Sequence, residues 1–255
     1  MTVSGSQTPR GCAASGRDTP LAERAVVIGA GVAGLLSAAA CAPHFREVVV
    51  FDKDRLPAAP DNRRSVPQGQ HVHGILKGGE ERIEALLPGN RARLRTLGAS
   101  VLRAGRDWHH FDSGEWQPSR DLGITAHAQS RALFEFSLRH SLTQYRNVRI
   151  RDAQRIGDLT LERGAEGARV VGVDLDGPVG GRVEAELVVD ASGRGSRLPR
   201  WLPSNGFRAP SKSVCEMDIC YVTGIFAKPA EWLGRAEAWV LRPRPPDTRS
   251  ATLIP

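Results

Sequence analysis

The stretch Arg24-Ala25-Val26-Val27-Ile28-Gly29-Ala30-Gly31-Val32-Ala33-Gly34 decides the fold of this 255-residue chain. Apolar residues lead into three glycines spaced Gly-x-Gly-x-x-Gly, and a second apolar run follows from Leu35 to Cys41. A third run, Val48–Phe51, ends on Asp52, about 20 positions after the first glycine. Strand, glycine turn, helix and strand in this order predict a parallel βαβ unit.

Each glycine has a physical task if such a unit binds a dinucleotide. Gly29 permits the tight turn, Gly31 lets the backbone approach a pyrophosphate, and Gly34 lets helix and sheet pack closely. The helix N-terminus favours the negative charge of the pyrophosphate, and Asp52 would accept hydrogen bonds from ribose hydroxyls. The motif therefore predicts an ADP-binding site, with a ligand-free glycine turn as the alternative. It fits NAD and FAD equally, because both contain an ADP half.

Composition and charge narrow the possible partners and location. No apolar run approaches the ~20 residues needed to cross a bilayer, so we expect no stable membrane insertion. Residues 1–22 lack the apolar core of a secretory signal and are expected to form a disordered leader, which favours the cytoplasm. The net charge of +7 comes from scattered arginines with only four lysines, so no nucleic-acid partner is expected.

Metal binding and disulfide formation are not expected either. The four cysteines are too few and too irregularly spaced for a disulfide framework or a zinc site. His71 and His73 would share a face of an extended chain, but no nearby Cys, Asp or Glu completes a ligand set.

Four further segments separate FAD from NAD. Leu187–Arg197, which reads LVVDASGRGSR, resembles the second conserved region of FAD-dependent aromatic hydroxylases, geranylgeranyl-reductase-like enzymes and flavin halogenases. Arg64–Gly74 (RSVPQGQHVHG), Leu86–Gly89 (LLPG) and Gln129–Leu133 (QSRAL) are similar to blocks of a bacterial subgroup that includes hydroxylase-like proteins and polyether epoxidases. From about Ala25 onward, the chain resembles an FAD-dependent monooxygenase of this family.

The resemblance implies cofactor contacts but no identifiable catalytic side chain. Gly29, Gly31, Gly34 and Asp52 would hold the ADP part of FAD, while Asp190 and Gly193 belong to the block near the pyrophosphate. Arg131 and one of Arg63 and Arg64, preferably Arg64, would meet phosphate or ribose, and Gln70 and His71 would lie beside the flavin ring.

The resemblance also implies a reaction. FAD, reduced by a transient NAD(P)H donor, would insert oxygen into a small aromatic, polyene or isoprenoid molecule through a flavin hydroperoxide, giving hydroxylation or epoxidation. The first alternative is an FAD-dependent reductase of isoprenoid double bonds. A halogenase comes third, because the Trp-x-Trp-x-Ile-Pro segment of those enzymes is absent. A non-catalytic remnant or binding subunit is the alternative from a different class.

The expected architecture is an α/β fold in which a Rossmann-like parallel sheet carries a β-meander at about residues 150–185. The FAD-binding domain is expected to be discontinuous, comprising residues 23–90 and 130–205, and residues 91–129 and 206–255 would form a partial β-rich substrate domain. Family members continue past Pro255 with a Gly-Asp block that contacts the flavin. We therefore expect a C-terminally truncated chain with little monooxygenase activity of its own.

Overall fold

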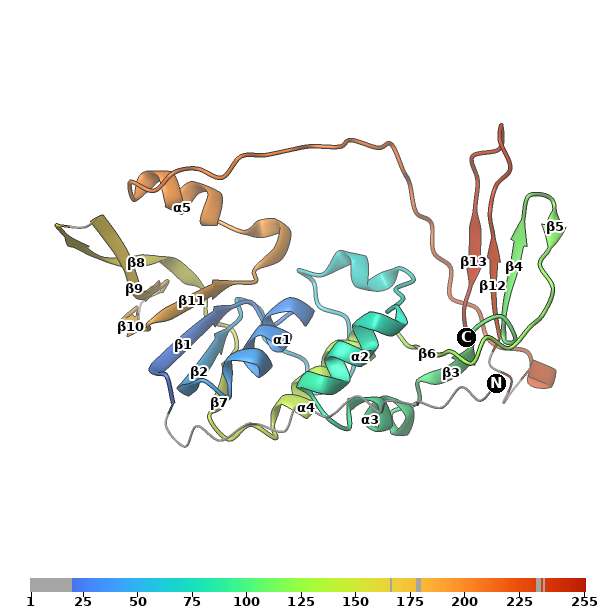
Figure 1. The fold of residues 1–255 in the computed structure, drawn as a ribbon, viewed down its shortest axis with the longest axis horizontal. Helices are drawn as coiled ribbons and strands as arrows, with labels where there is room; N and C mark the ends of the chain where they lie inside the picture. Colours follow the sequence, from blue (N-terminus) through green and yellow to red (C-terminus); the bar gives the residue numbers. More distant parts are fainter. Residues whose placement is uncertain (1–19, 166, 178–179, 233–234, 236) are drawn as a thin grey trace, which may run out of the picture.

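The structure, a computed structural model, describes residues 20–255 except 166, 178–179, 233–234 and 236 (Figure 1). Most of the expected leader, residues 1–19, lies outside the described residues. Strand β1 (Ala22–Ile28) begins at the last position of that leader, two residues earlier than the apolar pattern indicates.

The central sheet has four parallel strands in the order β11-β1-β2-β7. Helix α1 (Val32–Cys41) connects β1 to β2 (Phe45–Phe51), which confirms the predicted βαβ unit. The outer strands, β7 (Val148–Arg151) and β11 (Leu187–Asp190), come from much later in the sequence. Non-local segments therefore complete the sheet that the glycine turn begins.

Both faces of the sheet are covered at β1 and β2, which explains the continuous apolar runs Ala25–Ile28 and Val48–Phe51. Ala25 and Val27 pack with α1 and with α4 (Arg131–Leu142) on one face. Val26 and Ile28 face the other side, together with Trp201 of α5 (Leu198–Ser204). Burying each such valine contributes about 1.5–3 kcal/mol relative to leaving it in water.

The expected β-meander is a separate antiparallel sheet in the order β10-β9-β8. It consists of β8 (Ile156–Gly164), β9 (Gly167–Leu175) and β10 (Arg182–Glu184). In Figure 1 it lies with α5 on the side of the central sheet away from α1 and α4. The parallel sheet and meander together confirm the predicted α/β fold class.

Helices and short turns fill the segments between the strands. Helix α3 (Asn90–Thr96) packs beside α4, and helix α2 (Lys77–Leu86) packs beside α1 and α3. Two 3₁₀ turns are η1 (Pro67–Gln70) and η2 (Gly193–Gly195). The Ser130 hydroxyl caps α4 by accepting a hydrogen bond from the Leu133 N–H at 3.1 Å. This cap fixes the start of the helix that carries Arg131.

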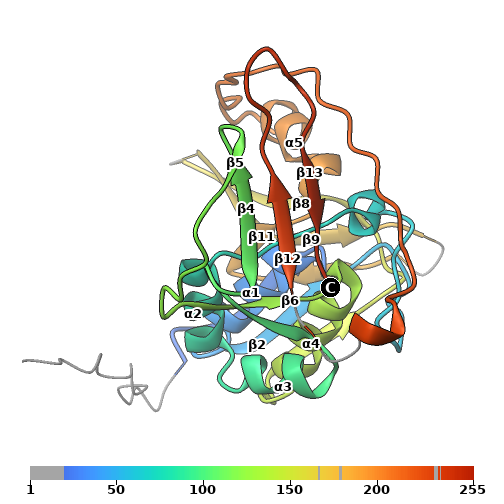
Figure 2. The same ribbon diagram turned by 90° about the vertical axis from the view of Figure 1, so that its right-hand side faces the viewer.

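A second β-rich part joins the segments assigned by sequence to a substrate domain (Figure 2). Strand β12 (Ala238–Leu241) pairs in parallel with β4 (Trp108–Asp112), and β5 (Glu115–Trp116) and β13 (Ala251–Leu253) complete a sheet in the order β13-β12-β4-β5. Strands β3 (Ser100–Arg103) and β6 (Thr125–Ala128) form a two-stranded antiparallel sheet, and η3 (Ala230–Trp232) precedes β12. Their small core contains Leu102, Ala128 and Ala238.

Residues 207–229 connect α5 to this second part without forming a helix or a strand. The orange trace in Figure 1 arches over the molecule along this course. Its large apolar side chains are 59–95% exposed and contribute little to either core: Val214, Met217, Ile219, Tyr221, Val222, Ile225 and Phe226.

The closest approach between α1 and β1 yields a stability prediction. A Cβ built on Gly34 would lie 1.8 Å from the Gly29 carbonyl oxygen, whereas one built on Gly78 of α2 meets nothing within 4 Å. We expect Gly34→Ala to lower the free energy of unfolding by about 3 kcal/mol or more through overpacking. Gly78→Ala should raise it by up to about 1 kcal/mol, because alanine favours a helix. Urea unfolding of both variants would measure this, and equal effects would contradict the close-packing argument.

Candidate nucleotide-binding site

The candidate site lies at the carboxyl ends of the parallel strands. The glycine turn follows β1, Asp52 follows β2, and Asp190 ends β11. This edge is the usual location of ligand sites in open parallel α/β sheets. The fold thus brings together residues that are as far apart as Gly29 and Asp190.

Two glycines of the turn have different surroundings. Gly29 has a φ of +103°, and a Cβ built on it would lie 2.6 Å from the Ala191 carbonyl oxygen, so the turn requires glycine here. Gly31 has an ordinary extended backbone, and a Cβ there would have only Arg63 Nη2 within 4 Å, at 3.8 Å. The chain therefore leaves space above Gly31 that its own packing does not use.

That space adjoins the N-terminus of α1. Gly31 is the N-cap, no side chain caps the helix, and its first turn contains no acidic residue. The first N–H groups of an α-helix have no partner within the helix, and the helix dipole favours negative charge near them. A phosphate fits this end of the helix on electrostatic grounds.

Asp52 is a buried carboxylate whose contacts hold the glycine turn. Its Oδ2 accepts hydrogen bonds from the Ala30 N–H at 2.6 Å and from Arg63 Nη1 at 3.1 Å. Its Oδ1 accepts one from the Asp54 N–H at 2.9 Å. These contacts use three of roughly four acceptor positions on the carboxylate, which leaves about one for a ribose hydroxyl.

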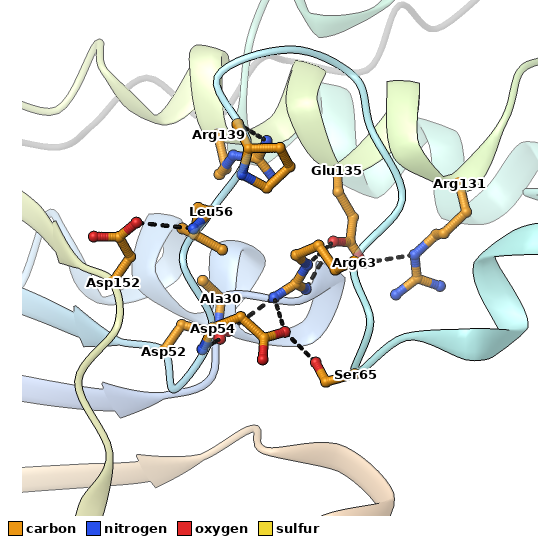
Figure 3. A network of polar contacts seen from close by, with 11 residues as sticks. Ala30, Asp52, Asp54, Leu56, Arg63, Ser65, Arg131, Glu135, Arg139 and Asp152 are labelled. Carbon is orange, nitrogen blue, oxygen red and sulfur yellow. Dashed lines mark hydrogen bonds and ion pairs between the residues drawn. The ribbon is translucent and has the colours of Figure 1, made fainter.

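Arg63 crosses the site and links the sheet to α4 (Figure 3). Its Nε and Nη2 donate to Glu135 Oε2 at 3.1 and 2.8 Å, while Nη1 contacts Asp52. Burial by itself lowers the pKa of this guanidinium, but the carboxylates of Glu135 and Asp52 outweigh that effect and raise the pKa above its ordinary value. Arg63 therefore stays charged although its side chain is only 5% exposed.

The sequence preference for Arg64 over Arg63 does not match this geometry. Arg63 is buried beside Asp52, whereas Arg64 is exposed. Two adjacent arginines in an irregular loop show no periodicity that separates the inward residue from the outward one. A phosphate contact from Arg64 stays a prediction, and Arg63 takes its place as the arginine that the fold puts at the site.

Arg131 borders a cavity beside the start of α1, and its contact with a phosphate or ribose stays a prediction. It occupies the first turn of α4, and its Nε donates to Glu135 Oε1 at 2.8 Å. It lines this cavity of about 210 Å³ together with Val32 of α1, His73, Gly74 and Gln129. The Gln129 side-chain oxygen is buried without a hydrogen-bond partner among the described residues. The cavity therefore offers one unused acceptor and one cationic side chain.

Gln70 and His71 are not among the residues that line this cavity. Gln70 is exposed at the end of η1, and His71 Nδ1 is 2.9 Å from the Thr223 hydroxyl oxygen. His73 lines the cavity instead. Proximity of Gln70 and His71 to a flavin ring stays a prediction, and the His71 ring contacts Thr223 and Tyr221 of the arch at residues 207–229.

Asp190 and Gly193 shape the turn after β11. Asp190 accepts hydrogen bonds from the Ser192 N–H at 2.9 Å and from the hydroxyls of Ser192 and Ser196. Gly193 has a φ of +73°, and a Cβ there would meet nothing within 4 Å. The Ala191 N–H donates to the Ile28 carbonyl at 2.8 Å, so this block lies against the glycine turn. Direct cofactor contacts from Asp190 and Gly193 stay predictions.

The residues present fit the ADP half of FAD. The open space at Gly31, the uncapped helix end and two guanidinium groups suit a pyrophosphate, and Asp52 retains an acceptor for ribose. Among the described residues, no group of three or more His, Cys, Asp or Glu is placed to hold a metal ion. Likewise, no described helix has the length and apolar character needed to span a membrane.

Sequence reasoning missed Glu135. It lies four residues after Arg131, on the side of α4 that also buries Phe134 and Leu138. The available signal was a carboxylate on the apolar face of a helix at an i,i+4 spacing from an arginine. Such a carboxylate requires a partner when buried.

Comparison with solved structures defines the class of fold. The FAD-dependent halogenase CndH of chondrochloren formation, from a myxobacterium, is 24% identical with a TM-score of 0.51, covering 70% of this chain and 39% of that one. PqsL of Pseudomonas aeruginosa, described as a probable FAD-dependent monooxygenase, is 17% identical with a TM-score of 0.57, covering 86% and 54%. The p-nitrophenol 4-monooxygenase PnpA of Pseudomonas putida is 16% identical with a TM-score of 0.53, covering 72% of this chain and 44% of that one. The chain has the fold of FAD-dependent monooxygenases and halogenases.

A curated relative resembles the chain more strongly in sequence. Protein Rv3254 of Mycobacterium tuberculosis is 35% identical over 221 residues, which cover 81% of this chain and 45% of the relative. The chain thus spans less than half the length of the curated relative it matches. No protein-family model matches the chain.

Removing the charge of Asp52 tests the buried network. Asp52→Asn leaves Arg63 with a single buried carboxylate partner and puts an amide group among N–H donors. We expect the free energy of unfolding to fall by about 3 kcal/mol, as when one partner of a buried ion pair is lost. The control is Glu162→Gln, whose partner Arg169 is 75% exposed, and whose effect should stay below about 0.5 kcal/mol. Chemical denaturation measures both, and a small effect of Asp52→Asn would show that the network does not support the fold.

Proposed function

We propose that this chain binds FAD and contributes to an FAD-dependent oxidoreductase of the monooxygenase type. The observation that carries the proposal is the open space above Gly31, at the uncapped N-terminus of α1. A glycine that has room for a side chain within its own fold suggests that something else needs the space. The fold and the LVVDASGRGSR block (Leu187–Arg197) support FAD rather than NAD as that occupant.

The chain's own residues would bind and orient the cofactor. The N–H groups at the start of α1 and the guanidinium of Arg63 would face the pyrophosphate, and Asp52 would accept from a ribose hydroxyl. Arg131 and the unpartnered oxygen of Gln129 would meet polar atoms of the part that extends into the cavity. Val32, Ile75 and Phe134 supply apolar walls that limit access of water.

When bound, FAD supplies the redox chemistry, and the protein's task is orientation and shielding.

We propose a small-molecule substrate of aromatic, polyene or isoprenoid type and NAD(P)H as a visiting electron donor. Because a single ADP-binding glycine string occurs, the donor would have no Rossmann site of its own in this chain. The substrate is proposed to meet the β-rich part formed by residues 91–129 and 206–255, with the FAD-binding domain at 23–90 and 130–205. A location in the cytoplasm belongs to the same proposal.

Cofactor preference is the first test of this function. We expect the purified chain to bind FAD in preference to NAD, because the proposal depends on the segments that separate the two cofactors. Pigment released by heat should have a flavin absorption spectrum and migrate as FAD. Titration of apoprotein with each cofactor gives the two dissociation constants. Tight binding of NAD with no affinity for FAD would refute the proposal.

A methyl group on Gly31 tests the observation that carries the proposal. Gly31→Ala places its Cβ 3.8 Å from Arg63 Nη2, an ordinary contact, so the free energy of unfolding should change by less than about 1 kcal/mol. FAD affinity should fall at least about tenfold, because the backbone can no longer approach the pyrophosphate closely. The control is Gly164→Ala at the end of β8, where a Cβ would meet nothing within 4 Å, and this variant should alter neither quantity. Unchanged FAD affinity in Gly31→Ala would show that the space does not receive a ligand.

A further inference from the structure

Helix α4 carries a carboxylate where its packing calls for an apolar residue. Glu135 is 4% exposed on the face that also buries Phe134, Leu138 and Leu142. An ionised carboxylate is costly to bury, and apolar replacement of a buried ion pair is often neutral or stabilising. Core packing by itself therefore gives no reason for a carboxylate at this position.

Glu135 binds two arginines from different elements. Its Oε2 accepts from Nε and Nη2 of Arg63, at 3.1 and 2.8 Å, in the loop before η1. Its Oε1 accepts from Nε of Arg131, at 2.8 Å, in the first turn of α4. Figure 3 shows the carboxylate between the two guanidinium groups. One side chain thus fixes the direction of two cations.

Both guanidinium groups keep donors for a further partner. Arg63 Nη2 lies next to the open space at Gly31, and Arg131 lines the cavity that begins at Val32. Among the described residues, neither terminal nitrogen of Arg131 has a hydrogen-bond partner, since its one bond uses Nε. The two arginines therefore border the end of α1 from two sides.

Local charge shows why a carboxylate is needed between them. Arg139 lies one helical turn beyond Glu135, and its Nη2 donates to the Pro57 carbonyl at 3.0 Å. Burial, and then the positive charge of Arg63, lower the pKa of Arg139 below its ordinary value. Without the charge of Glu135, three arginines would repel one another at this site, and Arg63 and Arg131 would lose the contacts that aim them.

We propose that Glu135 is a positioning residue that aims Arg63 and Arg131 at the phosphates of the bound nucleotide. The inference rests on the proposed function, because it requires an ADP-containing ligand at Gly31. Flexible arginine side chains lose conformational freedom on binding, and fixing them beforehand reduces that loss. Because Arg63 and Arg131 enclose the carboxylate, the proposal requires no contact between Glu135 and the ligand.

The test compares two probes that differ in phosphate. ADP carries the diphosphate that the arginines would meet, whereas adenosine retains only the ribose and base. In Glu135→Gln we expect the dissociation constant for ADP to rise at least about tenfold, and that for adenosine to change less than about threefold. Isothermal titration of apoprotein measures both constants. The control is Glu47→Gln, which removes a carboxylate that also holds two arginines, Arg24 at 2.7 Å and Arg149 at 3.4 Å, at the opposite end of β2.

Several outcomes overturn the inference. One is an equal dissociation constant for ADP in Glu135→Gln and wild type. Another is an equal weakening of ADP and adenosine binding, which would indicate a packing role for Glu135. If Glu135→Gln does not fold, Glu135→Asp decides. The aspartate keeps the charge, but its shorter side chain should reach only one of the two arginines well. The preference for ADP over adenosine should therefore be reduced, and an unchanged preference would refute the proposal. A wild type that binds neither ADP nor FAD would overturn the proposed function and this inference together.

Discussion

The contact between α1 and β1 at Gly34 and Gly29 is the constraint on which the site depends. A Cβ built on Gly34 would lie 1.8 Å from the Gly29 carbonyl oxygen, so there is no room for a side chain between the helix and the strand. The helix axis is therefore fixed against the sheet, and its first turn is fixed at the strand's carboxyl end. Ala191 on the other side of Gly29 adds a second close contact. Together these contacts determine where the uncapped N–H groups lie.

A buried polar layer then ties this frame to helix α4 and the loop before η1. Asp52 holds the Ala30 N–H and Arg63, and Arg63 reaches Glu135 on α4. The hydrophobic cores on the two faces of the sheet give stability without direction, because apolar burial is non-directional. The charged chain supplies direction, since each of its hydrogen bonds tolerates a narrow range of geometry. The loop at Arg63 thus acquires a defined position although it has no regular secondary structure.

The βαβ unit within the central sheet could be predicted from sequence because its signals are local. Apolar runs, glycine spacing and the acidic residue after the second run identify β1, α1, β2 and Asp52 without any knowledge of distant residues. The pairing of β4 with β12 could not be predicted in this way, because it joins Trp108 to Ala238 through a parallel register set by neither turn nor helix. The burial of Arg63 rather than Arg64 could not be predicted for a related reason. The buried arginine is the one that reaches both Asp52 and Glu135, and Glu135 lies 72 residues away in the sequence.

The polar layer contains three carboxylates beside a site that is proposed to bind an anion. Asp52, Asp54 and Glu135 surround Arg63, so their charges oppose those of a diphosphate. Yet Arg63 Nη2 is the group nearest the space at Gly31. It donates one N–H to Glu135 Oε2 and keeps the other, while Asp52 and Asp54 face Nη1. Coulomb energy falls with distance, so the nearest cation dominates the potential at Gly31. Without these carboxylates, a buried guanidinium would have no compensation for lost hydration, and the loop could turn Arg63 outward as it turns Arg64. The negative residues therefore favour anion binding by keeping a positive group buried, charged and aimed at the helix end.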